Sequence, residues 1–225
     1  MKRKINTVLF DFEGTLVDFQ WKLDEAIYEV ISTLENAGYP SNLFGINPSY
    51  THIFNKSVEL DPCANDIQSS KILSIVSSIF DSYDSDALTR WQLHPHTMEV
   101  LNELKEDSFK LGLVTNIGER AISKALDKFK LSKIFDVIIT RNDVTRLKPD
   151  PEGLNSAIEK LNENTKKIVF VGDSYNDIEA ARKAGIFSCY LVGGENAQTK
   201  NSITEADYEI TSIIHLLTYC SLANS

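Results

Sequence analysis

Near its N-terminus the sequence reads Val8-Leu9-Phe10-Asp11-Phe12-Glu13-Gly14-Thr15-Leu16-Val17-Asp18. A short apolar run that ends in two carboxylates is typical of a buried strand that delivers acids to the carboxyl edge of a sheet. Open α/β sheets build ligand sites at that edge, so Asp11 and Glu13 are candidate functional residues. Alternation along a continued strand would point both side chains the same way, and Gly14 permits a sharp turn. The alternative interpretation is an ordinary strand followed by a solvated acidic turn.

The composition narrows the class of protein. The chain has 225 residues, of which 42% are hydrophobic, so it can form one large domain or a domain with an insert. Its formal net charge is −9 and it has no long basic tract, which disfavours binding to nucleic acid or to an anionic membrane. A phosphate-bearing ligand would therefore need local cations, backbone N–H groups or a metal ion. No apolar run is long enough for a signal peptide or a membrane span, and we expect a cytoplasmic protein.

The three cysteines, Cys63, Cys189 and Cys220, lie far apart in the sequence. Their number is odd and no Cys-x-x-Cys spacing occurs, so neither a zinc site nor a disulfide framework is indicated. This usage fits a reducing compartment.

The segment after the first strand contains only helical patterns. Apolar residues recur at helical spacing, and Asp61-Pro62 is expected to end one helix before the next begins. The helices are predicted at residues 21–38, 51–60, 67–80 and 84–92. Because no strand pattern interrupts them, we expect residues 19–92 to form an all-helical inserted domain. The two crossings, near Asp18 and near residues 92–95, would act as its hinge.

From Pro95 onward strands alternate with helices, which predicts a parallel sheet covered on both faces. Strands are predicted at residues 110–115, 135–140, 167–172, 187–192 and 208–211. Helices are predicted at residues 97–106, 119–129, 151–161, 176–184 and 212–219. Asp150 is the expected N-cap of the helix over 151–161, with Pro151 at its first position. Together with the first strand, residues 1–18 and 93–225 would form an α/β core domain.

Polar residues follow several of the predicted strands. Thr115 and Asn116 follow one, Asp173 and Asp177 follow another, and Lys148 lies in a connection between strands. The carboxyl ends of parallel strands meet on one edge, so these residues should gather beside Asp11 and Glu13. Taken singly, each is also explained as a helix cap or a solvated loop residue. Four acids crowded together would repel each other unless a cation were present, and hard oxygen ligands suit Mg²⁺.

The set of motifs resembles the haloacid dehalogenase-like hydrolase superfamily. Four motifs occur in its order, and they are Asp11-Phe12-Glu13-Gly14-Thr15-Leu16, Val114-Thr115-Asn116, Lys148-Pro149 and Gly172-Asp173-Ser174-Tyr175-Asn176-Asp177. The chain looks most like the phosphoglycolate-phosphatase and β-phosphoglucomutase branch. The resemblance implies a Rossmann-like parallel sheet core with an inserted all-helical cap domain. It also implies a Mg²⁺-dependent phosphatase that acts on a small phosphorylated metabolite through an aspartyl-phosphate.

The resemblance further implies a role for each motif residue. Asp11 would be the nucleophile, Glu13 the general acid and base, and Lys148 the cation that stabilises charge in the transition state. The metal ligands would be Asp11, the backbone carbonyl of Glu13 and Asp173, with Asp177 in the surroundings or bound through water. The substrate-binding residues would be Gly14, Thr115, Asn116 and Lys148.

Glu13 departs from the superfamily's usual pattern, which has Asp at this position. Glutamate keeps the carboxylate, and its reference pKa of about 4.3 is close to the value of about 3.9 for aspartate. Its side chain is one methylene longer, so a different rotamer must place the oxygen. Enolase-phosphatases of the same superfamily also carry Asp-x-Glu-Gly-Thr, whereas haloacid dehalogenases proper carry Tyr here and phosphonate hydrolases carry Ala. Retention of an acid therefore favours hydrolysis of a phosphate ester.

Three other functions use a similar set of residues. A phosphotransferase, such as a sugar-phosphate mutase, would pass the phosphoryl group to a sugar instead of water. A receiver-like signalling domain also pairs acids with Thr and Lys, but it would not need an inserted segment of this length. A phosphate-binding protein with weakened catalysis is a further alternative, because Glu13 is unusual.

The inserted segment should select the substrate. Its polar and aromatic candidates for the cleft are Phe19, Trp21, Lys22, Tyr50 and His52. His94 and His96, near the second crossing, are expected to be structural. Trp21 and Trp91 are expected to pack near the two crossings.

Overall fold

A computed structural model describes residues 5–60, 71–194 and 206–224 of the chain. Cys63, the expected break at Asp61-Pro62 and the start of the helix predicted over 67–80 lie outside these residues. Within the described residues, no helix combines the length and the apolar character that crossing a membrane requires.

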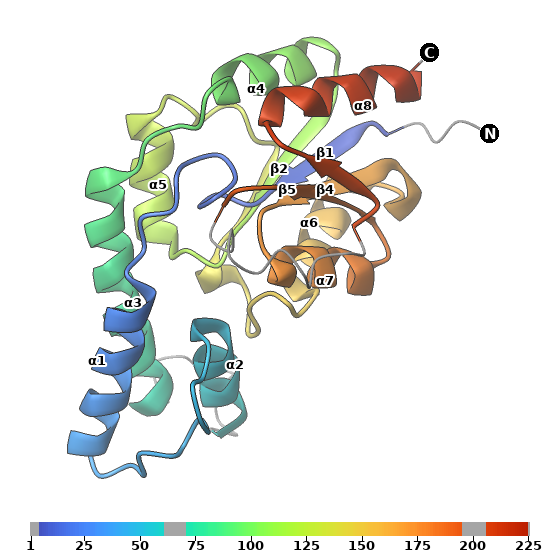
Figure 1. The fold of residues 1–225 in the computed structure, drawn as a ribbon. Helices are drawn as coiled ribbons and strands as arrows, with labels where there is room; N and C mark the ends of the chain where they lie inside the picture. Colours follow the sequence, from blue (N-terminus) through green and yellow to red (C-terminus); the bar gives the residue numbers. More distant parts are fainter. Residues whose placement is uncertain (1–4, 61–70, 195–205, 225) are drawn as a thin grey trace.

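A six-stranded parallel sheet forms the centre of the molecule (Figure 1). Its strands are β1 (Thr7–Phe10), β2 (Lys110–Val114), β3 (Val137–Ile139), β4 (Ile168–Gly172), β5 (Phe187–Leu191) and β6 (Tyr208–Ile210). Their order in space is β3-β2-β1-β4-β5-β6, with every neighbouring pair parallel. This confirms the α/β class predicted from the alternation of strands and helices.

The first strand occupies the middle of the sheet. Phe10 pairs with Leu113 of β2 on one side and with Val171 of β4 on the other. All four residues of β1 are buried, as expected of a parallel strand covered on both faces. The residues that follow β1 therefore emerge between the ends of its two neighbours.

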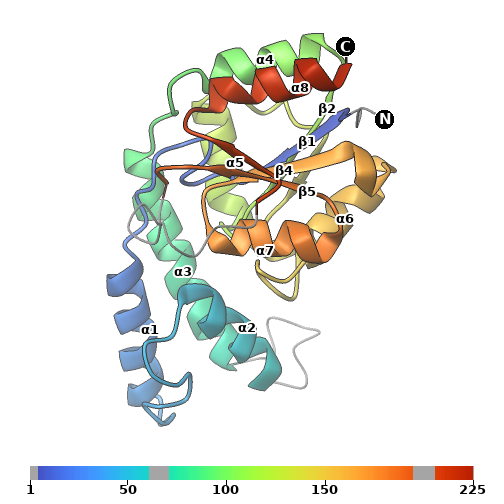
Figure 2. The ribbon, with the colours of Figure 1, turned by 45° about the vertical axis from the view of Figure 1, so that its right-hand side comes forward.

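Helices cover both faces of the sheet, as the two views in Figures 1 and 2 show. Helices α4 (Thr97–Glu106) and α8 (Leu216–Asn224) lie together on one face, and α6 (Glu152–Leu161) and α7 (Tyr175–Ala184) lie on the other. The remaining elements of this part are α5 (Glu119–Lys128) and the 3-10 helices η1 (Arg141–Asp143), η2 (Thr165–Lys167) and η3 (Ile213–His215). The strands and helices of the core thus follow the predicted order.

Three helices lie between β1 and β2 in the sequence and extend away from the sheet (Figure 1). They are α1 (Leu23–Asn36), α2 (Tyr50–Leu60) and α3 (Lys71–Arg90). Helices α1 and α2 both pack against α3, and α3 also contacts α5 of the core. The inserted segment is therefore helical throughout its described part, as the sequence predicted.

Two details of the predicted elements were wrong. Residues 71–90 form one continuous helix, not two helices that meet near residue 81, because Phe80, Asp84 and Ala87 continue a single buried face. The N-cap of α6 is Pro151, not Asp150, so the helix begins one residue later than predicted. The Asp150 carboxylate still accepts a hydrogen bond from the Glu152 N–H at 3.0 Å.

The two crossings into the helical segment are bonded to each other. Val17 and Leu93 form an antiparallel bridge, and the Asp18 N–H donates to the Gln92 carbonyl at 3.0 Å. The Gln92 N–H donates in return to Asp18 Oδ1 at 2.7 Å. The chain therefore leaves and re-enters the core at one place.

Candidate active site

The carboxyl ends of three neighbouring strands bring the predicted residues together. Asp11 follows β1, Thr115 follows β2 and Asp173 follows β4. Lys148 joins them from the connection between β3 and α6. These side chains are buried, and they line one cavity of about 190 Å³. The expectation that the strand ends converge on one site is confirmed.

Lys148 is the buried cation of this cavity. Its Nζ lies 2.5 Å from Asp11 Oδ1 and 2.7 Å from Asp177 Oδ1, and it donates to the Val114 carbonyl at 3.1 Å. Burial lowers the pKa of Lys148, but the two carboxylates outweigh burial and hold the pKa above its usual range. The side chain therefore stays charged and fixes the position of Asp11.

Asp11, Asp173 and Asp177 form a compact acidic cluster. Each offers a carboxylate oxygen, and the three oxygens lie within 4.8 Å of one another. Burial raises the pKa of Asp11 to about 6, an effect that Lys148 opposes and Asp177 increases. Three buried carboxylate oxygens at this spacing fit a hard divalent cation such as Mg²⁺. The residues present therefore suit the metal that the sequence predicted.

Gly14 lets the chain pass close to this cluster. Its φ of +83° lies in the left-handed region, and a Cβ at this position would lie 2.2 Å from the carboxylate of Asp173. The next residue, Thr15, donates its hydroxyl to Asp173 Oδ1 at 3.0 Å. Gly14 itself is not among the residues that line the cavity, and its assignment to substrate binding stays a prediction.

Glu13 also lines the cavity and is almost fully buried. Its Oε1 accepts hydrogen bonds from the Trp91 indole at 2.7 Å and from the Gln20 N–H at 2.9 Å. Burial raises the pKa of Glu13 to about 8, although both hydrogen bonds oppose the shift. The carboxyl therefore carries a proton at neutral pH.

Thr115 and Asn116 line the same cavity, but their side chains form different hydrogen bonds. The Thr115 hydroxyl oxygen accepts from the Ile117 N–H at 3.2 Å, which leaves its O–H able to donate to a ligand. The Asn116 side chain instead accepts from the Lys148 N–H at 3.1 Å. Asn116 therefore positions Lys148 through its side chain.

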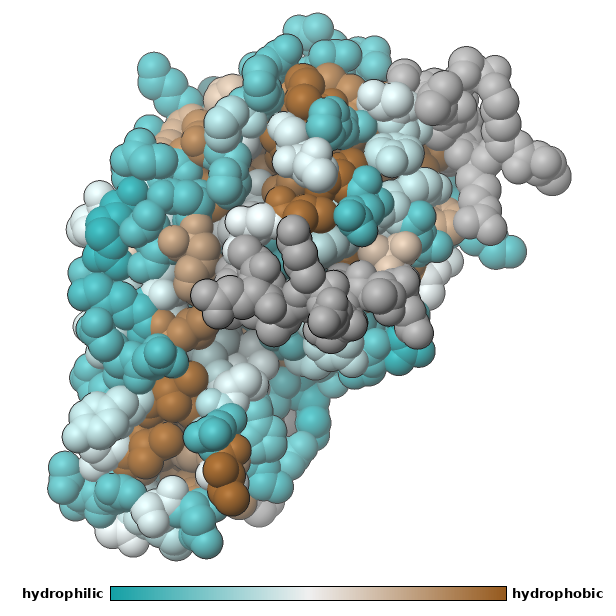
Figure 3. Space-filling view, in the orientation of Figure 1, coloured by the Kyte–Doolittle hydropathy of each residue, from teal (hydrophilic) through white to brown (hydrophobic). Residues whose placement is uncertain are grey.

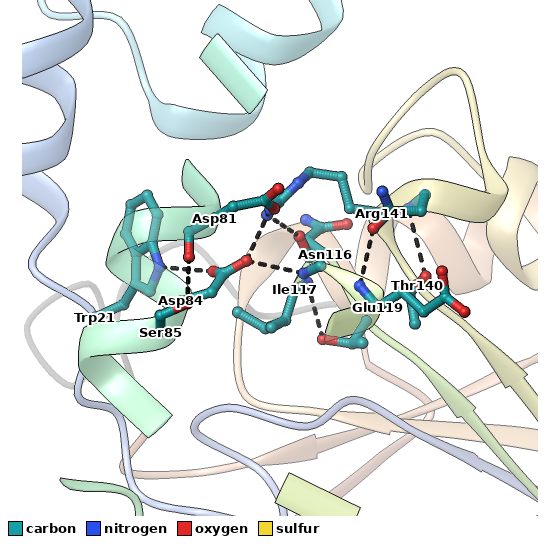
Figure 4. A network of polar contacts seen from close by, with 12 residues as sticks. Trp21, Asp81, Asp84, Ser85, Asn116, Ile117, Glu119, Thr140 and Arg141 are labelled. Atoms are coloured by element: carbon teal, nitrogen blue, oxygen red, sulfur yellow. Dashed lines mark hydrogen bonds and ion pairs between the residues drawn. The ribbon is translucent and has the colours of Figure 1, made fainter. Parts of the chain in front are cut away.

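A buried polar network joins α3 to the loop that contains Asn116 (Figure 4). Asp84, which is 1% exposed, accepts hydrogen bonds from Trp21 at 2.8 Å, the Gly118 N–H at 2.9 Å and Arg141 at 2.7 Å. Arg141 also pairs with Asp81 and donates to the Asn116 carbonyl at 3.1 Å. No pattern in the sequence indicates this network, because its members lie in four separate segments and match no motif.

The cavity also includes some of the candidates from the inserted segment. Phe19, Trp21 and Tyr50 line it, whereas Lys22, His52, His94 and His96 do not. Trp91, which sequence analysis assigned only to packing, also bonds Glu13. In the sequence, only the position of Trp91 next to the second crossing indicated that it could lie near the site.

The sequence pattern of haloacid dehalogenase-like hydrolases matches residues 8–191. The chain belongs to the haloacid dehalogenase-like hydrolase family. Pyrophosphatase PpaX of Bacillus cereus strain G9842 is 30% identical over 203 residues, which cover 88% of this chain and 82% of PpaX. The family membership confirms the resemblance seen in the motifs and makes this protein a hydrolase.

Two solved structures show the same fold as this haloacid dehalogenase-like hydrolase. A predicted phosphoglycolate phosphatase from Haemophilus somnus is 24% identical with a TM-score of 0.66, and the match covers 95% of this chain and 97% of the other. YfnB of Bacillus subtilis, whose structure contains magnesium, is 20% identical with a TM-score of 0.63. That match covers 96% of this chain and 99% of YfnB.

Proposed function

We propose that this hydrolase is a Mg²⁺-dependent phosphatase that cleaves a small phosphomonoester through an aspartyl-phosphate on Asp11. The observation that carries the proposal is one cavity that holds a cationic lysine, three clustered aspartates and a protonated glutamic acid. Each of the two chemical steps needs groups of these kinds.

In the first step an oxygen of Asp11 attacks the phosphorus atom and the bond from phosphorus to the leaving oxygen breaks. Lys148, at 2.5 Å from Asp11, holds the carboxylate in place and offsets the negative charge that develops on the phosphoryl oxygens. Glu13 gives its proton to the leaving oxygen, so the product departs as a neutral alcohol.

In the second step Glu13, now a carboxylate, accepts a proton from a water molecule. The water oxygen attacks the phosphorus of the aspartyl-phosphate, the bond to the Asp11 oxygen breaks, and phosphate is released. Glu13 regains its proton, so both acid and base roles fall to one residue. The bonds from Trp91 and Gln20 keep the carboxyl in one orientation during both steps.

Asp11, Asp173 and Asp177 would hold Mg²⁺ together with the backbone carbonyl of Glu13. The ion would offset the repulsion between the carboxylate nucleophile and the anionic phosphate. The short spacing of the three aspartates and the magnesium in YfnB both support this assignment. We also propose that the protein acts in the cytoplasm, since its described cysteines, Cys189 and Cys220, are free thiols.

Release of phosphate from p-nitrophenyl phosphate tests the proposal. We expect turnover with Mg²⁺, none with EDTA, and none for Asp11→Asn, because an amide cannot form the intermediate. Asp107→Asn is the matched control, since Asp107 is exposed at the end of α4 and does not line the cavity. An active Asp11→Asn protein would refute the nucleophile. Transfer to an added sugar in place of phosphate release would identify a phosphotransferase instead.

A further inference from the structure

Asp24, Ser49 and Thr51 of the inserted segment give the cavity a few polar groups besides the acidic cluster. The apolar part of the lining is made of Phe19, Trp21, Leu23, Ile27, Tyr50 and Ile117. All but Ile117 come from the helical segment or the crossing before it. Figure 3 shows hydrophobic surface along this segment beside α1. The leaving group of a substrate bound at Asp11 would lie against this wall.

The polar ends of the two largest wall residues already have partners. The Trp21 indole N–H donates to Asp84 at 2.8 Å, and the Tyr50 hydroxyl donates to the Asn116 carbonyl at 2.6 Å. The two rings pack edge to face with centroids 4.9 Å apart. What they present to the cavity is therefore mainly hydrocarbon.

The charges around the cavity are almost all negative. Among the residues that the structure describes, Lys148 is the only lysine or arginine in the cavity lining, and it is already paired with Asp11 and Asp177. Asp24 adds an exposed carboxylate on the helical side. A second anionic group on the substrate would meet Asp24 and an apolar wall without a cation, which is unfavourable.

Resting on the function proposed above, we infer that the preferred substrate is a compact phosphomonoester whose leaving group is uncharged and largely apolar. The cavity volume of about 190 Å³ favours a small leaving group. The inference separates this chain from PpaX, whose name describes a pyrophosphatase, because the leaving group of pyrophosphate is itself a phosphate anion.

Three substrates test the inference on the unmodified protein with Mg²⁺. They are phenyl phosphate, 4-carboxyphenyl phosphate and pyrophosphate. We expect kcat/KM for phenyl phosphate to exceed that for each of the others at least about tenfold, the size of one modest selectivity contact. The carboxylate makes its phenol the better leaving group, so intrinsic reactivity opposes the expected order. Equal or reversed order overturns the inference while the phosphatase assignment stands; no hydrolysis of any substrate removes the phosphatase assignment.

A charge placed in the wall provides the second test. Ile27→Lys puts a cation in the apolar wall, whereas Tyr28→Lys puts the same charge on the same helix at a residue that is 74% exposed and outside the cavity lining. We expect Ile27→Lys to lower the ratio of kcat/KM for phenyl to 4-carboxyphenyl phosphate about tenfold, and Tyr28→Lys to leave it unchanged. A ratio that shifts equally in both variants, or in neither, contradicts the assigned wall.

Discussion

Glu13 keeps its proton at neutral pH because its burial removes water from a carboxyl that no cation compensates. The pKa is about 8 in the folded protein and 4.5 for an ordinary glutamic acid. The unfolded chain therefore releases the proton more readily, so folding stability falls as pH rises from 4.5 to 8 and stays reduced above that. Each pKa unit corresponds to about 1.4 kcal/mol, and solvent relaxation makes the sum an upper limit.

Glu13→Gln should remove this pH dependence. Glutamine keeps an oxygen that accepts the bonds from Trp91 and Gln20, but it never ionises. We therefore expect the metal-free variant to lose less stability between pH 6 and pH 9 than the unmodified protein. Urea unfolding in EDTA measures this directly, and Glu103→Gln, at an exposed position on α4, is the control. The same loss of stability in all three proteins would show that Glu13 is already ionised at pH 6.

Lys148 has a second consequence besides catalysis, because two buried carboxylates depend on it. Lys148→Met leaves Asp11 and Asp177 without their cation, and breaking a buried pair in this way costs about 3–5 kcal/mol. We expect this loss in metal-free urea unfolding, together with loss of the phosphatase activity proposed above. Lys183→Met is the matched control, because that side chain is 40% exposed and pairs with Glu179 at 3.4 Å. Its cost should stay below about 1 kcal/mol.

The positions of site residues could be predicted where they follow from the order of the strands, and could not where they depend on contacts between distant segments. Asp11 and Asp173 directly follow neighbouring parallel strands, and Lys148 lies in the connection after a third strand, so the topology of the sheet brings them to one edge. The raised pKa of Glu13 could not be predicted, since it requires knowing how far folding buries the carboxyl, and residues as distant in the sequence as Trp91, 78 positions away, contact it. The residues of the helical segment that line the cavity were predicted only in part, because the orientation of a helix face depends on tertiary packing.

At the scale of elements, α3 is more than a packing helix. It carries Asp84 into the core, where Arg141 and the N–H of Gly118, the residue before α5, donate to it, and the close-up in Figure 4 shows Trp21 on the opposite side. Burial raises the pKa of Asp84, and Arg141 opposes that shift. The network explains why α3 remains helical past Asp81, where the sequence predicted a break: tertiary contacts override weak helix propensity.

Arg141→Met should therefore act on both stability and substrate binding. The substitution leaves Asp84 as a buried carboxylate without its cation, with an expected cost of about 3–5 kcal/mol. It also frees the Asn116 carbonyl from one donor, so we expect KM for p-nitrophenyl phosphate to rise. Asp84→Asn in the same chain should recover part of the stability by removing the unpaired charge.

Asp81→Asn is the control for this network, because the Asp81 side chain is 53% exposed. Its expected cost is below about 1 kcal/mol. Urea unfolding and steady-state kinetics on the four proteins separate the two effects. If Asp81→Asn and Arg141→Met lowered the free energy of unfolding equally, the buried ion pair between Arg141 and Asp84 would contribute no more to stability than a surface ion pair.

At the scale of the whole molecule, the acidic cluster draws on distant parts of the chain. Asp11 follows β1, whereas Asp173 and Asp177 surround the start of α7, so the cluster exists only in the folded protein. A cation bound there should stabilise the fold, by about 2.7 kcal/mol at a free concentration of 100 times Kd. For a chain of this length that corresponds to a rise in Tm of very roughly 5–10 °C.

Thermal unfolding with and without Mg²⁺ measures this stabilisation independently of activity. We expect a rise in Tm for the unmodified protein and a much smaller rise for Asp173→Asn. Asp107→Asn again serves as the control and should respond as the unmodified protein does. An Asp173→Asn protein with the full rise would place the ion elsewhere.

Because the two crossings are bonded to each other, the helical segment could be replaced as one unit. Asp18 and Gln92 bond each other through both backbone N–H groups, so the two ends of the segment are already closed by the core. A different insert would need to match these two end positions and to replace the contacts of α3 with Arg141 and the start of α5. Protein engineers could thus exchange the wall that selects the leaving group while Asp11, Lys148 and Asp173, which all belong to the core, remain as they are.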